Sequence, residues 1–123
     1  MRIAKLLVLF TLIISCAFVS FGFTSPQSLN NDNNNTESME KLGATVFERE
    51  CTACHAGGNN TIENDKTLKL DALKKFGFNA PTDIHKRVEE GKGVMPVFKD
   101  SLKAEEIDAV ANYVWTQAQK GWK

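Results

Sequence analysis

Two cysteines and a histidine occupy one short run of the sequence, Cys51-Thr52-Ala53-Cys54-His55, which has the pattern C-x-x-C-H. This pattern is typical of the attachment site of a c-type haem. If the run is helical, positions i, i+3 and i+4 share a face, so both thiols and the imidazole point the same way. We therefore predict that Cys51 and Cys54 form thioethers with the two vinyl groups of one haem, with His55 as the proximal ligand of the iron.

The cysteine pair has three weaker interpretations. A zinc site needs further ligands, and the remaining cysteine, Cys16, lies in an apolar leader. A thioredoxin-like site belongs beside a β-α-β pattern, and the sequence has no convincing strand run. A plain disulfide between Cys51 and Cys54 is the third alternative.

The iron of a redox haem usually takes a second axial ligand, and Met39, His85 and Met95 are the candidates. Met39 precedes the first expected helix, and His85 lies among charged residues where a solvated histidine is expected. Met95 lies between Gly93, which lets the backbone turn close to a flat cofactor, and Pro96, which stiffens the loop. We predict Met95 as the sixth ligand. Ligation by His and Met leaves no open iron position, so we expect an electron carrier and not an enzyme.

The chain has 123 residues and a formal net charge of zero, which allows one small domain. Residues 1–23 read as a signal peptide, because Arg2 and Lys5 precede an apolar stretch and small residues favour cleavage after Gly22. An uncleaved membrane anchor is the alternative. The residues around Cys16 also loosely resemble a lipoprotein box, although apolar residues follow where polar ones are expected.

An asparagine-rich stretch, residues 24–38, follows the leader and predicts a disordered polar linker. The folded domain is then residues 39–123. The balanced charge gives no basic patch for nucleic acid, and we expect a monomer. A domain of this size is marginal without a cofactor, so we expect haem binding and folding to be coupled.

Helical periodicity predicts an all-α domain of about four helices wrapped around one haem. Gly43 within the first helix predicts a close crossing with the last helix, because a residue without a side chain lets two backbones approach. A loop over residues 94–98 carries Met95. The expected helices cover residues 40–55, 66–76, 82–90 and 103–119.

The domain resembles the cytochrome c6 family of photosynthetic class I c-type cytochromes. The specific part of the resemblance is the ten-residue match through the C-x-x-C-H run and the terminal Lys120-Gly121-Trp122. The matching stretches are residues 43–47, 51–60, 66–68, 91–96 with Phe98, and 111–114.

The resemblance implies a four-helix class I fold with one covalent haem c and with His55 and Met95 as axial ligands. It also implies a soluble carrier in a thylakoid lumen, or in a periplasm, that takes electrons from cytochrome f of the cytochrome b6f complex. Photosystem I or a terminal cytochrome oxidase would be the acceptor.

Two positions depart from the family pattern. The family commonly has glutamine where this chain has Arg87, so a charge replaces a neutral group near the haem. It also commonly has a photosystem-docking arginine at the position of Ser101, where Lys99 is the nearest cation and is not equivalent to arginine. A divergent paralogue within the family fits these differences.

An electron carrier needs a docking edge, which we expect at Val94, Pro96, Val97 and the turn of residues 56–59, steered by Lys92, Lys99, Asp100 and Lys103. Two alternative functions remain. One is a gas sensor or peroxidase-type haem protein in which Met95 dissociates. The other is a membrane-tethered electron relay that keeps the leader and uses the asparagine-rich linker as a leash.

Overall fold

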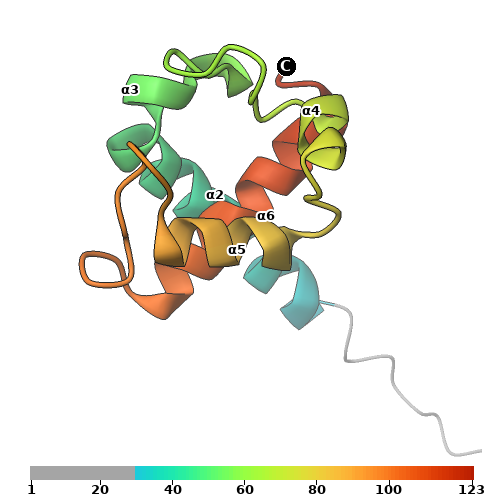
Figure 1. Ribbon diagram of the computed structural model, residues 1–123. Coiled ribbons are helices and arrows are strands. Elements are labelled where there is room, and N and C mark those ends of the chain that lie inside the picture. Colours follow the sequence, from blue (N-terminus) through green and yellow to red (C-terminus); the bar gives the residue numbers. More distant parts are fainter. Residues whose placement is uncertain (1–29) are drawn as a thin grey trace, which may run out of the picture.

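A computed structural model describes residues 30–123, and the described part is helical with no strand (Figure 1). The leader, with Cys16 and Gly22, and residues 24–29 of the expected linker lie outside the described residues. In chain order the elements are the helices α2 (Asn30–Glu50) and α3 (Thr52–His55), the 3₁₀ turn η1 (Ala56–Gly58), and the helices α4 (Leu70–Lys75), α5 (Pro81–Glu90) and α6 (Ala104–Lys120).

Helices α2 and α6 cross at close range, and the core is built around this crossing. A Cβ atom at Gly43 would lie 2.3 Å from the carbonyl oxygen of Ala109, so only glycine permits this approach. The prediction of a close crossing at Gly43 is therefore confirmed. Val46 of α2 and Val110 of α6 are completely buried beside it. The core continues into α4 and α5 through Leu73, Ile84 and Val88, and into the following segment through Phe98 and Leu102.

Side-chain caps fix where α5 and α6 begin. Asp83 accepts hydrogen bonds from the backbone N–H groups of Asn79 (2.8 Å) and Ala80 (3.0 Å), which satisfies donors at the start of α5. Glu106 accepts a hydrogen bond from the backbone N–H of Lys103 (3.0 Å) at the start of α6. These two helices agree with the ranges predicted from periodicity to within one residue at each end.

The structure corrects the expected boundaries of the first helix. Residues 30–38, which the sequence predicts as part of a disordered linker, form the first turns of α2. Once residues 39–50 are anchored against α6, adding helical residues costs little, because the nucleus already exists. At the other end, Cys51 separates α2 from α3 with φ −115° and ψ −30°, so the continuous helix expected over residues 40–55 is interrupted there.

The second expected helix, over residues 66–76, is also shorter in the structure. The α4 helix occupies Leu70–Lys75, and residues 59–69 run as an irregular segment between η1 and α4. Asn60 organises this segment, because its side-chain oxygen accepts from the backbone N–H groups of Ile62 (3.0 Å) and Glu63 (2.9 Å). The backbone of residues 66–69 is bonded outside a helix: the Lys66 carbonyl accepts from the Asn60 side-chain amide (3.0 Å), and the Leu68 N–H donates to the Gly58 carbonyl (2.8 Å). These bonds replace the hydrogen bonds of a first helical turn, so the helix begins later.

Candidate functional site

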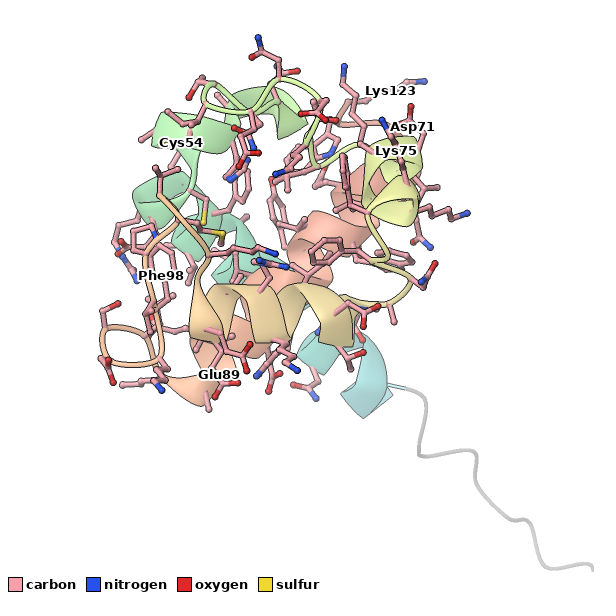
Figure 2. The ribbon with its side chains drawn as sticks, in the orientation of Figure 1. Cys54, Asp71, Lys75, Glu89, Phe98 and Lys123 are labelled. Carbon is pink, nitrogen blue, oxygen red and sulfur yellow. The ribbon has the colours of Figure 1, made fainter. Side chains whose placement is uncertain are left out.

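The C-x-x-C-H run forms one helical turn. The backbone N–H of Cys51 donates to the carbonyl of Phe47 (2.9 Å), and the N–H of His55 donates to the carbonyl of Cys51 (2.8 Å). Both cysteines are free thiols, so the alternative of a disulfide between them is not formed in the structure. Figure 2 labels Cys54 on the α3 turn.

The two thiols differ in their surroundings. Cys54 is exposed, whereas Cys51 is partly buried and packs against the hydrophobic core. Burial raises the pKa of the Cys51 thiol to about 11, with a smaller contribution from the negative charge of Glu50. Among residues 30–123 no group of three or more His, Cys, Asp or Glu side chains is arranged to hold a metal ion.

The ring of His55 is oriented by a backbone carbonyl. Its Nδ1 lies 3.0 Å from the carbonyl oxygen of Asn59. A carbonyl can only accept, so Nδ1 carries the hydrogen and Nε2 keeps a free lone pair. A hydrogen bond of this kind fixes the orientation of a metal-binding imidazole and increases its basicity. The role of Asn59 had no sequence signal, because it is performed by a main-chain atom that every residue has.

Met95 lies in the loop between α5 and α6, and backbone hydrogen bonds hold this loop. The backbones of Lys92 and Met95 exchange two hydrogen bonds, of 3.1 and 3.0 Å, which close a tight turn. Gly91 has φ +63°, and a Cβ there would lie 2.6 Å from the carbonyl oxygens of Met95 and Pro96, so the turn folds directly back on this glycine.

The far end of the Met95 loop is anchored in the core. The backbone N–H of Phe98 donates to the carbonyl of Val88 in α5 (3.2 Å), and the Phe98 side chain is buried. Met95 and Cys51 both pack against the same buried cluster, so the structure brings the loop and the C-x-x-C-H turn to one core. Figure 2 shows Phe98 on the same side of the molecule as Cys54.

The other two candidates for the sixth ligand lie elsewhere. Met39 is in the first half of α2. His85 lies between α5 and α6, where its Nδ1 is 2.7 Å from Asp108 and its Nε2 is 3.9 Å from Glu89. Carboxylates therefore face both ring nitrogens of His85, which leaves Met95 as the candidate beside the C-x-x-C-H turn.

The Arg87 side chain is partly buried. Its guanidinium lies 5.4 Å from the centre of the Phe78 ring, within the range of a cation–π contact. Both residues line a cavity of about 400 Å³ that extends to Gly91 and Lys92 at the base of the Met95 loop. Phe78, which sequence reasoning did not single out, is thus part of the candidate site, and its position directly after Gly77 gave no signal of this.

The edge of the Met95 loop is apolar and exposed. Val94 is 73% exposed and Val97 is 46% exposed, while the Met95 side chain between them is partly buried. A third exposed apolar side chain, Ile62 at 60%, lies on the segment after η1 and was not predicted. Contiguous exposed apolar side chains mark surfaces where contacts form, whereas a single exposed one is common on any protein.

These residues fit a covalently attached haem. A c-type haem uses two thiols for attachment and an imidazole and a thioether as ligands. This chain has two thiols one turn apart, an imidazole with a free Nε2, and a thioether on a loop against the same core.

None of the helices in residues 30–123 has the length and hydropathy needed to cross a bilayer.

Known proteins that are similar to this chain are c-type cytochromes. Residues 38–114 match the family model described as cytochrome c oxidase, cbb3-type, subunit III. The chain is 48% identical over 80 residues to a cytochrome c6 of Microcystis aeruginosa, covering 65% of this chain and 99% of that protein. It is 49% identical over 80 residues to a cytochrome c6 of Bumilleriopsis filiformis, covering 65% and 93%.

Solved structures give the same result. The cytochrome c6 of the diatom Phaeodactylum tricornutum superposes with a TM-score of 0.66 at 41% identity, covering 68% of this chain and 98% of that one. Oxidised cytochrome c6A from Arabidopsis thaliana superposes with a TM-score of 0.66 at 33% identity, covering 69% and 95%. The predictions of an all-α class I cytochrome c fold and of a covalently bound haem c are confirmed by these similarities.

Proposed function

The chain belongs to the cytochrome c6 family, and from this premise we propose that it carries single electrons on a haem c ligated by His55 and Met95. When bound, the haem supplies an iron that gains or loses one electron. The chain's own part is to attach the haem, to set the two ligands and to present one edge to partners. Cys51 and Cys54 on one turn would form the two thioethers.

One observation carries this proposal: the turn that holds His55 and the loop that holds Met95 pack against the same buried cluster, through Cys51 and Met95. The 3.0 Å contact from His55 Nδ1 to the Asn59 carbonyl oxygen supports ligation through Nε2, because it occupies the other ring nitrogen. Two backbone hydrogen bonds between Lys92 and Met95 close the loop that carries the Met95 sulfur. A ligand loop held in this way favours an iron with both axial positions filled. This supports electron transfer over gas sensing or peroxidase chemistry.

The exposed valines support docking through the Met95 edge. Val94 and Val97 form an apolar surface beside the ligand loop, and the exposed Lys92, Lys99 and Asp100 are charges at its rim. A small apolar contact with charged surroundings suits brief encounters, because rim charges raise the rate of association more than the affinity.

The partners we propose are cytochrome f of the cytochrome b6f complex as donor and photosystem I or a terminal oxidase as acceptor. The site of action would be a thylakoid lumen or a periplasm, reached through the leader of residues 1–23. Ser101 occupies the position of the family's docking arginine, so the acceptor contact would depend on Lys99 or on a different partner.

Replacing Met95 tests the ligation directly. We expect Met95→Ala to abolish the sulfur-to-iron charge-transfer band of the oxidised protein and to lower the reduction potential, because the thioether favours ferrous iron. Val94→Ala, one residue away and exposed, is the matched control and should leave both unchanged. An unaltered spectrum in Met95→Ala would refute the ligation.

Carbon monoxide separates the carrier from the alternatives. Reduced wild-type protein should not bind it rapidly at neutral pH, whereas Met95→Ala should, because its iron has a vacant position. Rapid binding by the wild type would favour the gas-sensor interpretation. Sequencing the N-terminus of the mature protein decides between a free carrier and a tethered relay.

Docking is tested at Val94 by two substitutions of similar size. Val94→Asp should slow electron exchange with cytochrome f and with the acceptor, because it places a charge in an apolar contact. Val94→Thr keeps the shape without the charge and should be close to wild type. Equal rates for all three proteins would exclude this edge as the docking surface.

A further inference from the structure

We infer that Trp122, next to the C-terminus, is a positioning residue that holds the carbonyl group orienting His55. The inference rests on the proposed function, because His55 acts as a haem ligand there. It depends on the packing of the Trp122 ring on Gly58, on two hydrogen bonds that link Trp122 to Leu68 and Leu68 to Gly58, and on the covalent bond from Gly58 to Asn59.

The indole ring lies directly on the backbone of Gly58. A Cβ atom at Gly58 would be 2.5 Å from three atoms of the Trp122 ring, so no side chain can stand between them. Gly58 is buried and has φ +73°, a conformation that glycine adopts without strain. The ring therefore forms one wall against which the end of η1 is pressed.

Two hydrogen bonds close a loop around this contact. The Trp122 Nε1 donates to the carbonyl oxygen of Leu68 (3.0 Å), across 54 positions of sequence. The backbone N–H of Leu68 donates to the carbonyl oxygen of Gly58 (2.8 Å). The indole thus contacts Gly58 through its face and is linked to it again through Leu68.

Asn59 follows Gly58 and carries the carbonyl that accepts from His55. Its N–H donates to the carbonyl of Ala56 (3.1 Å), and its side-chain amide donates to the same oxygen (3.2 Å). Nearby, the N–H of Thr61 donates to the carbonyl of Cys54 (3.1 Å). The rigid peptide plane between Gly58 and Asn59 ends at the Cα atom of Asn59. A shift of Gly58 therefore displaces the residue whose carbonyl oxygen lies 3.0 Å from His55 Nδ1.

Trp122 is itself held in an uncommon backbone conformation. Its φ is +57°, which is uncommon for a residue other than glycine. The Phe47 and Tyr113 rings lie 5.2 and 6.4 Å from it, centre to centre, and its backbone N–H donates to the carbonyl of Gln117 (2.9 Å). These contacts hold Trp122 in this strained backbone conformation.

Figure 1 shows the C-terminus ending beside the segment that joins η1 to α4, at the edge of the molecule that carries α3. The last residues of the chain therefore complete the wall behind the histidine turn. On this basis the terminal Trp122 supports His55, whereas Met95 is supported by its own loop.

Hydrogen exchange in the holoprotein tests the inference. We expect Trp122→Leu, which keeps an apolar side chain, to speed exchange of the His55 Nδ1 hydrogen and of the Leu68 amide by roughly tenfold or more, the loss of about one hydrogen bond. The Phe98 amide, which anchors the Met95 loop, should exchange at its wild-type rate. Trp122→Phe keeps a ring on Gly58 without the Nε1 donor and should show a smaller increase at the same two hydrogens.

Ile107→Ala is the control, because it removes a buried side chain at the other end of α6. It should raise exchange at Phe98 and Leu68 alike if it acts only through global stability. Wild-type rates at His55 and Leu68 in Trp122→Leu, or an equal rise at Phe98, would overturn the inference. If Trp122→Leu does not fold, unchanged rates in Trp122→Phe overturn it instead. The Leu68 amide reports on this wall whichever residue ligates the iron, so failure of the Met95→Ala test is a separate result.

Discussion

The two halves of the candidate site are supported in different ways. Met95 is held by its neighbours in sequence, through the Lys92 turn and the Phe98 anchor to Val88. His55 also has a local contact, to Asn59, but the carbonyl it uses is backed by Trp122 from the far end of the chain. A ligand on a self-contained loop can be rearranged without disturbing the fold, whereas the histidine side is tied to the packing of α2 and α6 through the aromatic cluster of Phe47, Tyr113 and Trp122.

The largest expected effect comes from filling the space under the indole ring. Gly58→Ala places a Cβ 2.5 Å from Trp122 and also forces alanine to φ +73°. We expect a loss of about 3–5 kcal/mol in the free energy of unfolding, measured by urea titration, because overpacking adds to backbone strain. Gly57→Ala is the control at φ +58°, where the nearest atom is 3.6 Å away, and should cost only about 1–2 kcal/mol. Equal losses would show that the ring does not press on Gly58.

The equivalent change on the methionine side should affect ligation more than folding. Gly91→Ala places a Cβ 2.6 Å from the carbonyl oxygens of Met95 and Pro96, so the loop must move. We expect a loss of about 2–3 kcal/mol together with a weakened sulfur-to-iron band in the oxidised spectrum. Gly93→Ala, at φ +59° with nothing within 4 Å, should keep the band. A full-strength band in Gly91→Ala would mean that the loop is not the rigid unit described above.

Arg87 offers a smaller test on the methionine side. Its guanidinium lies over Phe78 in the cavity that reaches the base of the Met95 loop. A haem held by Met95 would have this cation nearby, and removing a nearby cation favours the ferric state. Arg87→Gln should therefore lower the reduction potential by roughly 30–60 mV, at most about a tenfold change in the one-electron equilibrium. Lys86→Gln, also at this cavity but exposed, is the control and should shift the potential less. Equal shifts would mean that Arg87 acts only through overall charge.

The smallest expected effect is the pH dependence of the α6 start, where the Met95 segment ends. A hydrogen bond from the Lys103 backbone, with a smaller contribution from Arg49, lowers the pKa of Glu106 below its ordinary value. The stabilising contribution of Glu106 is therefore complete above the unfolded-state pKa and is lost as the pH falls through the folded-state pKa. Glu106→Gln should flatten this acid-side fall in the urea midpoint, while Glu105→Gln should not. The same acid-side slope in Glu106→Gln as in the wild type would assign the slope to other carboxylates.

Much of the methionine side could be read from the sequence. The residue types around Met95 predict a tight turn, because the loop contains Gly91, Gly93 and Pro96. The ranges of α5 and α6 followed from periodicity and from the residue types at the helix ends. Local chemistry decides these features, so a sequence contains enough to predict them. The C-x-x-C-H run predicted its own helical turn for the same reason.

The remaining features came only from tertiary structure. The main-chain carbonyl of Asn59, the placement of Phe78 beside Arg87 and the seat of Trp122 on Gly58 each depend on where distant segments meet. The helical state of residues 30–38 was missed because an anchored helix extends through polar residues whose composition favours disorder. The order of residues determined which groups can hold a haem, because covalent attachment and ligation need particular side chains at particular spacings. Only the folded chain decided what holds those groups still, because that support comes from backbone atoms and packed rings whose partners lie far away in sequence.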